Sequence, residues 1–195
     1  MLVVIVILGI LMSLAVAGVT SALKSARVTS TESTIEGLAA NCEQYRSRWG
    51  DYPPSTLAEM KVTMPNDLNN GIEALTACLA SRTKFEPLLT IRDDQLLNVD
   101  GDTATRNITN WYFGDNALRE ISDGFGFAFA YMHWKDYDRP NPATRRIKVD
   151  SSSPDMGFDP ARSPATKTYL RPNKFQILSV GPDGKSGTAD DVQAR

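Results

Sequence analysis

The sequence predicts an α+β protein in which one long N-terminal helix leads into a domain built on a small antiparallel sheet. Three observations predict this class. Residues 1–23 carry no ionisable side chain, the first being Lys24. Helical periodicity then continues without a proline as far as Trp49. Beyond that point, short runs that alternate large and small side chains are separated by turn residues, which is typical of the strands of a small sheet.

The composition limits the classes of function. The chain has 195 residues, with 21 Lys+Arg against 23 Asp+Glu. We expect no nucleic-acid partner, because nucleic-acid binders usually carry a basic excess or stripe. Two cysteines are too few for a disulfide scaffold, and a single histidine excludes a metal site built from several histidines. The length fits one globular domain with an additional segment.

Residues 1–23 are expected to form the transmembrane half of the long helix. In residues 1–19 only Ser13 is a polar residue. As a helix, these residues rise about 29 Å, which is the thickness of a bilayer core. A cleaved signal peptide would have a basic region before a shorter apolar core. A buried helix of a globular domain would also have a shorter apolar run.

Residues 24–52 are expected to form the amphipathic half of the same helix. Gly37 is the only glycine between Thr20 and Trp49. Apolar side chains recur there at steps of three and four, which marks one helix face: Ile35, Leu38, Ala39, Cys42, Tyr45 and Trp49. Gly50 is a suitable C-cap, and the prolines after it end the helix. The two halves together predict one helix of roughly 48 residues.

Small side chains recur every four positions along the helix. The row begins with Gly9, Ser13, Ala17 and Ser21 and continues to Gly37. In lipid, helices associate through close packing over such rows. Two interpretations stay open: a specific packing ridge for assembly, or a segment that is simply rich in small residues.

Residues 53–195 are expected to form the globular domain. A turn-rich stretch is followed by a short helix over 72–82, whose apolar residues fall on one face. Residues 91–110 resemble an acidic loop. The alternation in 125–134 predicts a strand with its aromatic side chains on one face, namely Phe125, Phe127, Phe129 and Tyr131.

Two further strands are predicted nearer the C-terminus. They cover residues 145–149 and 175–180, with a long proline-rich irregular loop over 150–173 between them. The last strand runs into Gly181-Pro-Asp-Gly184, which is a strong turn signal.

The C-terminal loop, residues 179–191, is the candidate metal site. Asp183, Asp190 and Asp191 lie within nine residues, among three glycines, and Ser179 can add a hydroxyl or a carbonyl oxygen. Ca²⁺ takes six to eight oxygen ligands of these kinds. The alternative is a polar turn without metal. Asp100-Gly-Asp102 is a second acidic turn, a pattern that is more often a solvated loop.

No catalytic constellation is visible. His133 has no nucleophile or orienting acid that the sequence places beside it, so we interpret it as a partly buried structural residue. None of the common nucleotide-binding, hydrolase or metalloprotease motifs occurs. We therefore expect a protein that is not an enzyme.

The two cysteines lie on apolar helix faces, Cys42 on the long helix and Cys78 on the short one. In an oxidising compartment they can form a disulfide. The alternative is a pair of small buried apolar side chains.

The motifs together resemble the type IV pilin-like superfamily. Residues 1–11 resemble the pilin helix start, and Tyr45-Arg-Ser-Arg-Trp-Gly50-Asp-Tyr52-Pro53 resembles the Tyr…Gly-x-Tyr-Pro end of that helix. Three further segments are similar to the major pseudopilin of type II secretion systems: Asn70-Gly-Ile-Glu-Ala-Leu75, Asp123-Gly-Phe-Gly126 and the tail Leu178–Asp191. The helix specifies the superfamily, and the tail points to the major pseudopilin.

The resemblance implies a type IV pilin fold and a structural subunit of a periplasmic pseudopilus that drives protein export. It implies a single-pass inner-membrane protein with its domain in the periplasm, from a family with a methylated N-terminus. Residues 1–23 would pack in the core of a homopolymer filament. The other implied partners are minor pseudopilins and the inner-membrane assembly platform, and the tail aspartates would bind Ca²⁺.

Two alternatives remain open at this point. One is a true type IV pilin for adhesion or DNA uptake, which would have the same fold. The other is a membrane-tethered Ca²⁺-binding module that never polymerises. The chain also departs from the family pattern: it begins directly after the position of the family's Phe-Thr-Leu-Ile-Glu, lacks the proline that many members carry near Ala17, and has a longer loop over 136–173.

Overall fold

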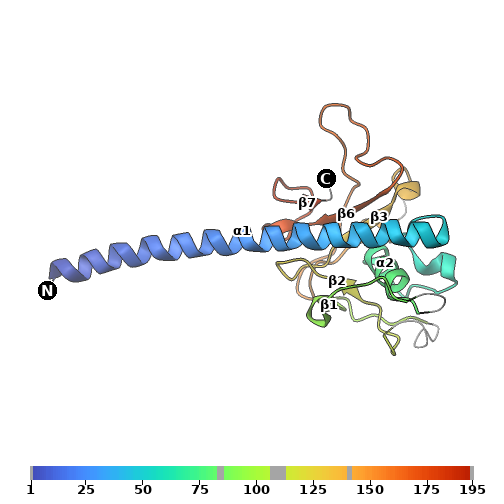
Figure 1. Cartoon of the computed structure of the whole chain (residues 1–195), viewed down its shortest axis with the longest axis horizontal. Helices are drawn as coiled ribbons and strands as arrows, with labels where there is room; N and C mark the ends of the chain where they lie inside the picture. Colours follow the sequence, from blue (N-terminus) through green and yellow to red (C-terminus); the bar gives the residue numbers. More distant parts are fainter. Residues whose placement is uncertain (1, 83–85, 106–112, 140–141, 194–195) are drawn as a thin grey trace.

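A single helix, α1 (Leu2–Trp49), runs the length of the molecule, and the rest of the chain packs beside its C-terminal half (Figure 1). The computed structural model describes residues 2–82, 86–105, 113–139 and 142–193, without the side chains of residues 2, 3, 5–15, 17, 59, 60 and 142. Short antiparallel sheets and a second helix complete the domain. The predicted α+β class, with a long N-terminal helix and small antiparallel sheets, is confirmed.

The end of α1 follows the local sequence. The helix has 48 residues, as expected, and stops at Gly50, whose φ of +87° lies in the left-handed region. The Gly50 N–H donates to the carbonyl oxygen of Arg46 at 2.8 Å, which closes the last turn. Pro53 and Pro54 then carry the chain away from the helix axis.

The predicted apolar face of α1 is the face that packs on the domain. Ile35, Leu38 and Cys42 are buried, and Ala39 and Tyr45 pack against the same core. Thr31 extends this face by one turn, because its hydroxyl accepts the N–H of Gly124 at 3.0 Å. The prediction was wrong for Trp49, which is 44% exposed at the end of the helix.

The N-terminal half of α1 extends away from the domain (Figure 1). Among its described side chains, Val4, Val16, Val19 and Leu23 are large apolar groups that are between 56% and 64% exposed. Across the described part of the chain, no helix has both the length and the apolar character needed to cross a bilayer.

The second helix, α2 (Asn70–Ala80), is buried in the domain. It begins two residues before the predicted start, because Asn69 supplies the cap position in a left-handed conformation, with φ +51°. The Asn69 side chain donates to the Glu120 carboxylate at 3.0 Å and to the Lys148 carbonyl at 2.9 Å, which ties the start of α2 to two neighbouring segments.

The one-sided burial predicted for this helix was wrong, because every residue of α2 is buried. Strands β2 (Glu120–Ile121) and β3 (Ala130–His133) and helices α1 and α3 (Pro142–Arg145) all pack against it. The approach to β3 is close: a Cβ added at Gly71 would lie 2.0 Å from the carbonyl oxygen of Tyr131. Only glycine fits at this position without a shift of one of the two backbones.

The main sheet has three antiparallel strands in the order β3-β6-β7, formed by Ala130–His133, Phe175–Ser179 and Val192–Gln193. In the register, Ala130 pairs with Leu178 and Ser179 pairs with Val192. Two-stranded sheets join β1 (Leu96–Leu97) to β2 (Glu120–Ile121), and β4 (Arg146–Ile147) to β5 (Met156–Gly157). The strands expected in 145–149 and 175–180 are thus present.

Both faces of the main sheet are buried. Phe129 and Tyr131 pack on the side of α1 and α2. Ala130, Met132 and Leu178 pack on the opposite side, against residues from the loop that follows β3 and from β4 and β5. A sheet covered on both faces explains why four consecutive residues of β3 are all buried.

The aromatic face predicted for residues 125–134 was wrong in part. The carboxylate of Asp123 accepts the N–H groups of Phe125 at 2.7 Å and Phe127 at 3.0 Å, so this stretch is a tight turn and the strand begins only at Ala130. Phe127 consequently packs in the core opposite to that of Phe129 and Tyr131.

Short helices complete the described chain. The four-residue α3 spans Pro142–Arg145. The 3-10 helices are η1 (Leu57–Met60), η2 (Asp93–Gln95), η3 (Trp134–Asp136) and η4 (Gly181–Asp183). The acidic loop predicted over 91–110 contains η2 and β1, and its residues 106–110 lie outside the described part. The loop over 150–173 is irregular apart from β5 and one bridge, Arg162 with Tyr169.

The close contact at Gly71 makes a testable prediction. Gly71→Ala should destabilise the folded domain by about 1–3 kcal/mol, because its methyl group would overlap the Tyr131 carbonyl. The matched control is Gly37→Ala on the exposed face of α1, where a Cβ meets no atom within 4 Å. The control should stabilise by about 0.5–1 kcal/mol through helix propensity. Denaturant unfolding of both variants checks this, and equal stability of the two would contradict the packing described.

Candidate functional site

The C-terminal loop folds back along the main sheet. Gly181 and Gly184 have φ values of +65° and +68°, which lets the chain reverse after β6 and return as β7. A Cβ at Gly181 would lie 2.1 Å from the carbonyl oxygen of Asp190, so the two ends of the loop touch at this glycine. The predicted turn at 181–184 is confirmed as η4 and its cap.

The structure brings the three predicted aspartates around one hydroxyl group. Thr188 Oγ1 lies 2.6 Å from Asp190 Oδ1 and 3.4 Å from an oxygen of each of Asp183 and Asp191. The Thr188 hydroxyl holds the pKa of Asp190 below its usual range. Two of the aspartates also accept backbone N–H groups, Asp183 from Lys185 and Asp191 from Gly187.

The hydroxyl of Ser179 is engaged elsewhere. It is fully buried, donates to Asp123 Oδ2 at 2.5 Å and accepts the N–H of Gly181 at 3.1 Å. The expectation that this hydroxyl joins the aspartates is therefore corrected, because Asp123 already holds it. Ser179 instead connects the turn after β6 to the turn that precedes β3.

The C-terminal loop also meets the long helix. Lys24, Val28 and Glu32 of α1 form one side of a pocket of about 380 Å³, and Pro182 and residues 189–193 form the other. The loop thus packs beside α1 close to where the helix leaves the domain (Figure 1).

A second acidic cluster, of which sequence reasoning found Asp100 and Asp102 but missed Glu73, lies inside the domain. Carboxylate oxygens of Glu73, Asp100 and Asp102 lie within 4.8 Å of one another. Of the residues the structure describes, these are the only ones that form a group of three possible metal ligands this close together. The tail aspartates do not meet that condition.

The fold creates this cluster from two separate segments. Glu73 lies in the first turn of α2. Asp100 and Asp102 lie in the turn after β1, where Asn98 Oδ1 accepts the N–H groups of Gly101 at 2.8 Å and Asp102 at 3.1 Å. Asp100-Gly-Asp102 was expected to be a solvated loop, but Asp102 is only 8% exposed, because Glu73 and Asn66 close over it.

Burial raises the pKa values of two of these acids. It raises the pKa of Glu73 well above its usual range, and the nearby carboxylates of Asp102, Glu120 and Asp100 raise it further. Burial, with Asp100 beside it, raises the pKa of Asp102 to about 7. The one signal in the sequence was that Glu73 is the only charged residue of α2, so this helix has no charged outer face.

Glu120 is a buried acid of a different kind. Its carboxylate accepts hydrogen bonds from Asn69 Nδ2 at 3.0 Å and from the Val99 N–H at 3.1 Å. Burial nevertheless raises its pKa to about 8. Glu120 thus anchors the start of α2 to the turn after β1.

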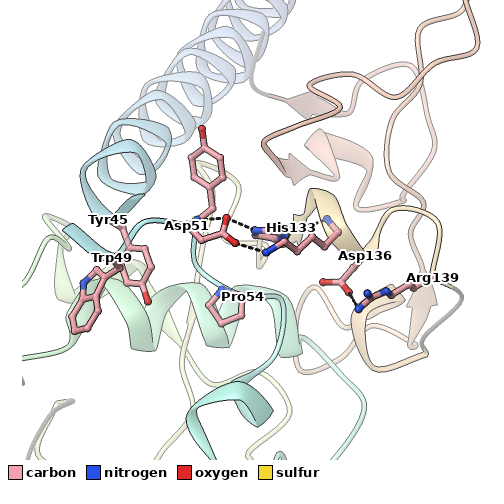
Figure 2. A pocket seen from close by; sticks show the side chains of 9 residues that line it. Tyr45, Trp49, Asp51, Pro54, His133, Asp136 and Arg139 are labelled. Carbon is pink, nitrogen blue, oxygen red and sulfur yellow. Dashed lines mark hydrogen bonds and ion pairs between the residues drawn. The ribbon is translucent and has the colours of Figure 1, made fainter. Parts of the chain in front are cut away.

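His133 belongs to a pocket of about 280 Å³ at the end of α1 (Figure 2). The Lys135 N–H donates to its Nδ1 at 3.2 Å, so Nε2 carries the proton and faces Asp51 Oδ1 at 3.1 Å. Burial opposes ionisation of Asp51, but Lys135, the Tyr52 N–H and His133 outweigh it and lower the pKa of Asp51 to about 2. These contacts join the end of α1 to β3, which supports a structural role for His133.

The remaining predicted residues are the two cysteines and the small-residue row of α1. Cys42 and Cys78 are buried and are not joined by a disulfide, and both serve as small side chains in the packing of α1 on α2. Of the small-residue row, Ser21 is exposed, while Gly9, Ser13 and Ala17 lie outside the described side chains.

Comparison of the chain with protein-family models, with curated proteins and with solved structures gives no match.

The buried acids predict a pH dependence of stability. The pKa of Glu120 is about 8 in the folded chain against 4.5 in its unperturbed state. Protonated Glu120 therefore contributes to the free energy of unfolding below about pH 4.5, and this contribution is lost as the pH rises toward 8. For Glu120 alone, the loss between pH 5 and pH 8 is on the order of 3 kcal/mol.

Denaturant unfolding in chelator at several pH values measures this loss. Glu120→Gln keeps an acceptor for Asn69 but cannot ionise, so its stability should fall less between pH 5 and pH 8 than that of the unmodified chain. The exposed Asp94→Asn is the control and should follow the unmodified chain. Parallel curves for all three proteins would show that Glu120 does not titrate in this range.

Proposed function

We propose that this chain is a structural subunit of a periplasmic pseudopilus that serves protein export by type II secretion. The observation that carries the proposal is the exposure of the described large apolar side chains in the first half of α1. Val16, Val19 and Leu23 are 64%, 58% and 56% exposed. Covering each such side chain fully contributes about 1.5–3 kcal/mol, so this surface strongly favours an apolar environment.

The geometry of the chain supports assembly through this half of the helix. The domain packs beside the C-terminal half of α1 only (Figure 1). All residues from Gly18 to Arg27 are exposed, so the helix is accessible on every side before the domain begins. Helices of several copies can therefore bundle in a filament core while their domains stay outside.

The proposal gives residues 1–23 two environments. Before assembly they span the inner membrane, with the domain in the periplasm. After assembly they pack against the same segment of neighbouring copies, where the small side chains of Gly9, Ser13, Ala17 and Ser21 permit close approach. Minor pseudopilins and the inner-membrane assembly platform are the further partners in this scheme.

The C-terminal loop is proposed to bind Ca²⁺ through Asp183, Asp190 and Asp191. Two features of the chain support this. The three carboxylates surround one hydroxyl group, and carboxylate oxygens are the ligands that Ca²⁺ prefers. The loop also packs beside Lys24, Val28 and Glu32 of α1. An ordered tail would therefore brace the helix at the point where it leaves the domain.

Assembly through the helix can be tested by enlarging its small side chains. Gly9→Leu and Ala17→Leu should each abolish filaments in electron micrographs, because the helices can no longer approach closely. Both variants should still appear in the membrane fraction. Ala40→Leu, at an exposed α1 position outside the row, is the matched control and should assemble normally.

Normal filaments from Gly9→Leu and Ala17→Leu would refute packing through this row. A chain that forms no filament even without substitution would favour the non-polymerising Ca²⁺-binding module. If filaments form and the gene neighbourhood encodes a retraction ATPase, the true type IV pilin would be favoured instead.

Calcium binding by the tail has a local readout. Ca²⁺ should slow hydrogen exchange of the backbone amides in 181–193, since the cation relieves repulsion among the three carboxylates and holds the loop in one conformation. Asp190→Asn and Asp191→Asn should each remove this protection. Asp155→Asn, an exposed acid in another loop, is the control and should leave it intact. If chelator does not change exchange in 181–193 of the unmodified chain, the tail is an ordinary acidic turn.

A further inference from the structure

The buried cluster of Glu73, Asp100 and Asp102 carries an inference that is independent of the proposed function. Glu73 is fully buried, and neither of its carboxylate oxygens has a hydrogen-bond partner among the described residues. Asp102 Oδ1 is likewise buried without a partner in that part of the chain. These are the same side chains whose oxygens converge to within 4.8 Å.

Without a bound cation, this group of buried acids is energetically unfavourable. None of the ion pairs among the described residues involves Glu73, Asp100 or Asp102. Burying unpaired carboxylates is strongly unfavourable. Protonating Glu73 removes its charge but leaves a buried O–H donor with no acceptor, which is also unfavourable. A bound cation satisfies the charge and the oxygens together.

We propose that Glu73, Asp100 and Asp102 form a binding site for a hard divalent cation, with Ca²⁺ as the expected ion. The three acids supply oxygen ligands only, which suits Ca²⁺ or Mg²⁺ and disfavours metals that prefer nitrogen or sulfur. Ca²⁺ fits better, because ligands held by two separate segments tolerate its irregular geometry more readily than the strict octahedron of Mg²⁺.

Neighbouring amides complete the site. Asn66 Nδ2 donates to Asp100 Oδ2 at 2.8 Å and to Asp102 Oδ2 at 3.3 Å, which orients these carboxylates. Asn70 lies one helical turn before Glu73, and its Oδ1 is also buried without a hydrogen-bond partner among the described residues. Its carbonyl oxygen is therefore a further candidate ligand.

The site borders solvent at Asp100, which is half-buried. The neighbouring Asn66 and Asn70 line a pocket of about 510 Å³ beside η1. The cation would join α2 to the turn after β1, through Glu73 and Asp100, which are more than twenty residues apart in the sequence. It would thus stabilise the buried helix of the domain rather than the C-terminal tail.

The test uses the full chain in detergent. Asp190→Asn and Asp191→Asn are introduced so that the tail does not bind Ca²⁺. Calorimetric titration with CaCl₂ should show one ion bound per chain. At Ca²⁺ about a hundredfold above its Kd, the melting temperature should rise by about 5–10 °C relative to chelator. Absence of both binding and stabilisation with CaCl₂, and equally with MgCl₂ and MnCl₂, would overturn the proposal.

Adding Glu73→Gln to this protein distinguishes a cation ligand from an acid that is only buried. In chelator the variant should melt at the same temperature or higher, because an uncharged amide replaces an unpaired buried carboxyl group. In Ca²⁺ the rise in melting temperature should be lost, so the Glu73→Gln variant should then melt below the protein that keeps Glu73. A Ca²⁺-dependent rise that survives Glu73→Gln would also overturn the site.

Two further variants complete the design. Asp102→Asn repeats the test should Glu73→Gln fail to fold, and it should likewise lose the rise. Glu120→Gln is the matched control, because Glu120 is equally buried but both its oxygens have hydrogen-bond donors. It should keep at least half of the Ca²⁺-dependent rise. Loss of the whole rise in Glu120→Gln would place the cation elsewhere.

Discussion

The complete burial of α2 is the constraint on which the rest of the domain depends. Gly71 brings the first turn of this helix against the β3 backbone, at a distance that excludes any side chain. Asn69 bonds the same end of the helix to Glu120 and Lys148. With α2 held in this way, α1 packs across one side of it and the main sheet on another, so the apolar core has no open face.

This burial also explains the unusual electrostatics of the domain. A helix with no exposed face has nowhere to direct a charged side chain, so Glu73 points at the turn that carries Asp100 and Asp102. Glu120 lies nearby but is bonded by Asn69 and Val99. The contrast between a bonded and an unbonded buried acid separates a structural anchor from a candidate ligand.

The two halves of the long helix lie in different environments. Its second half belongs to the domain core through Ile35, Leu38 and Cys42. Its first half extends away from the domain, and the large apolar side chains described there are exposed. The C-terminal loop packs near the boundary between the halves, beside Lys24 and Val28. The loop therefore lies beside the helix where its exposed half begins.

Local sequence by itself determined the length of α1, its end at Gly50, its buried face, the last strand and the turn after it, because periodicity, glycine and proline act over a few residues. It also identified the tail aspartates as candidate ligands, because they are close together in the sequence. Tertiary structure alone decided that α2 has no exposed face, that Phe127 and Phe129 lie on opposite sides of the sheet, and that Ser179 bonds Asp123. The meeting of Glu73 with Asp100 and Asp102 is of the same kind, because the segments that carry them are distant in sequence and become neighbours only through packing.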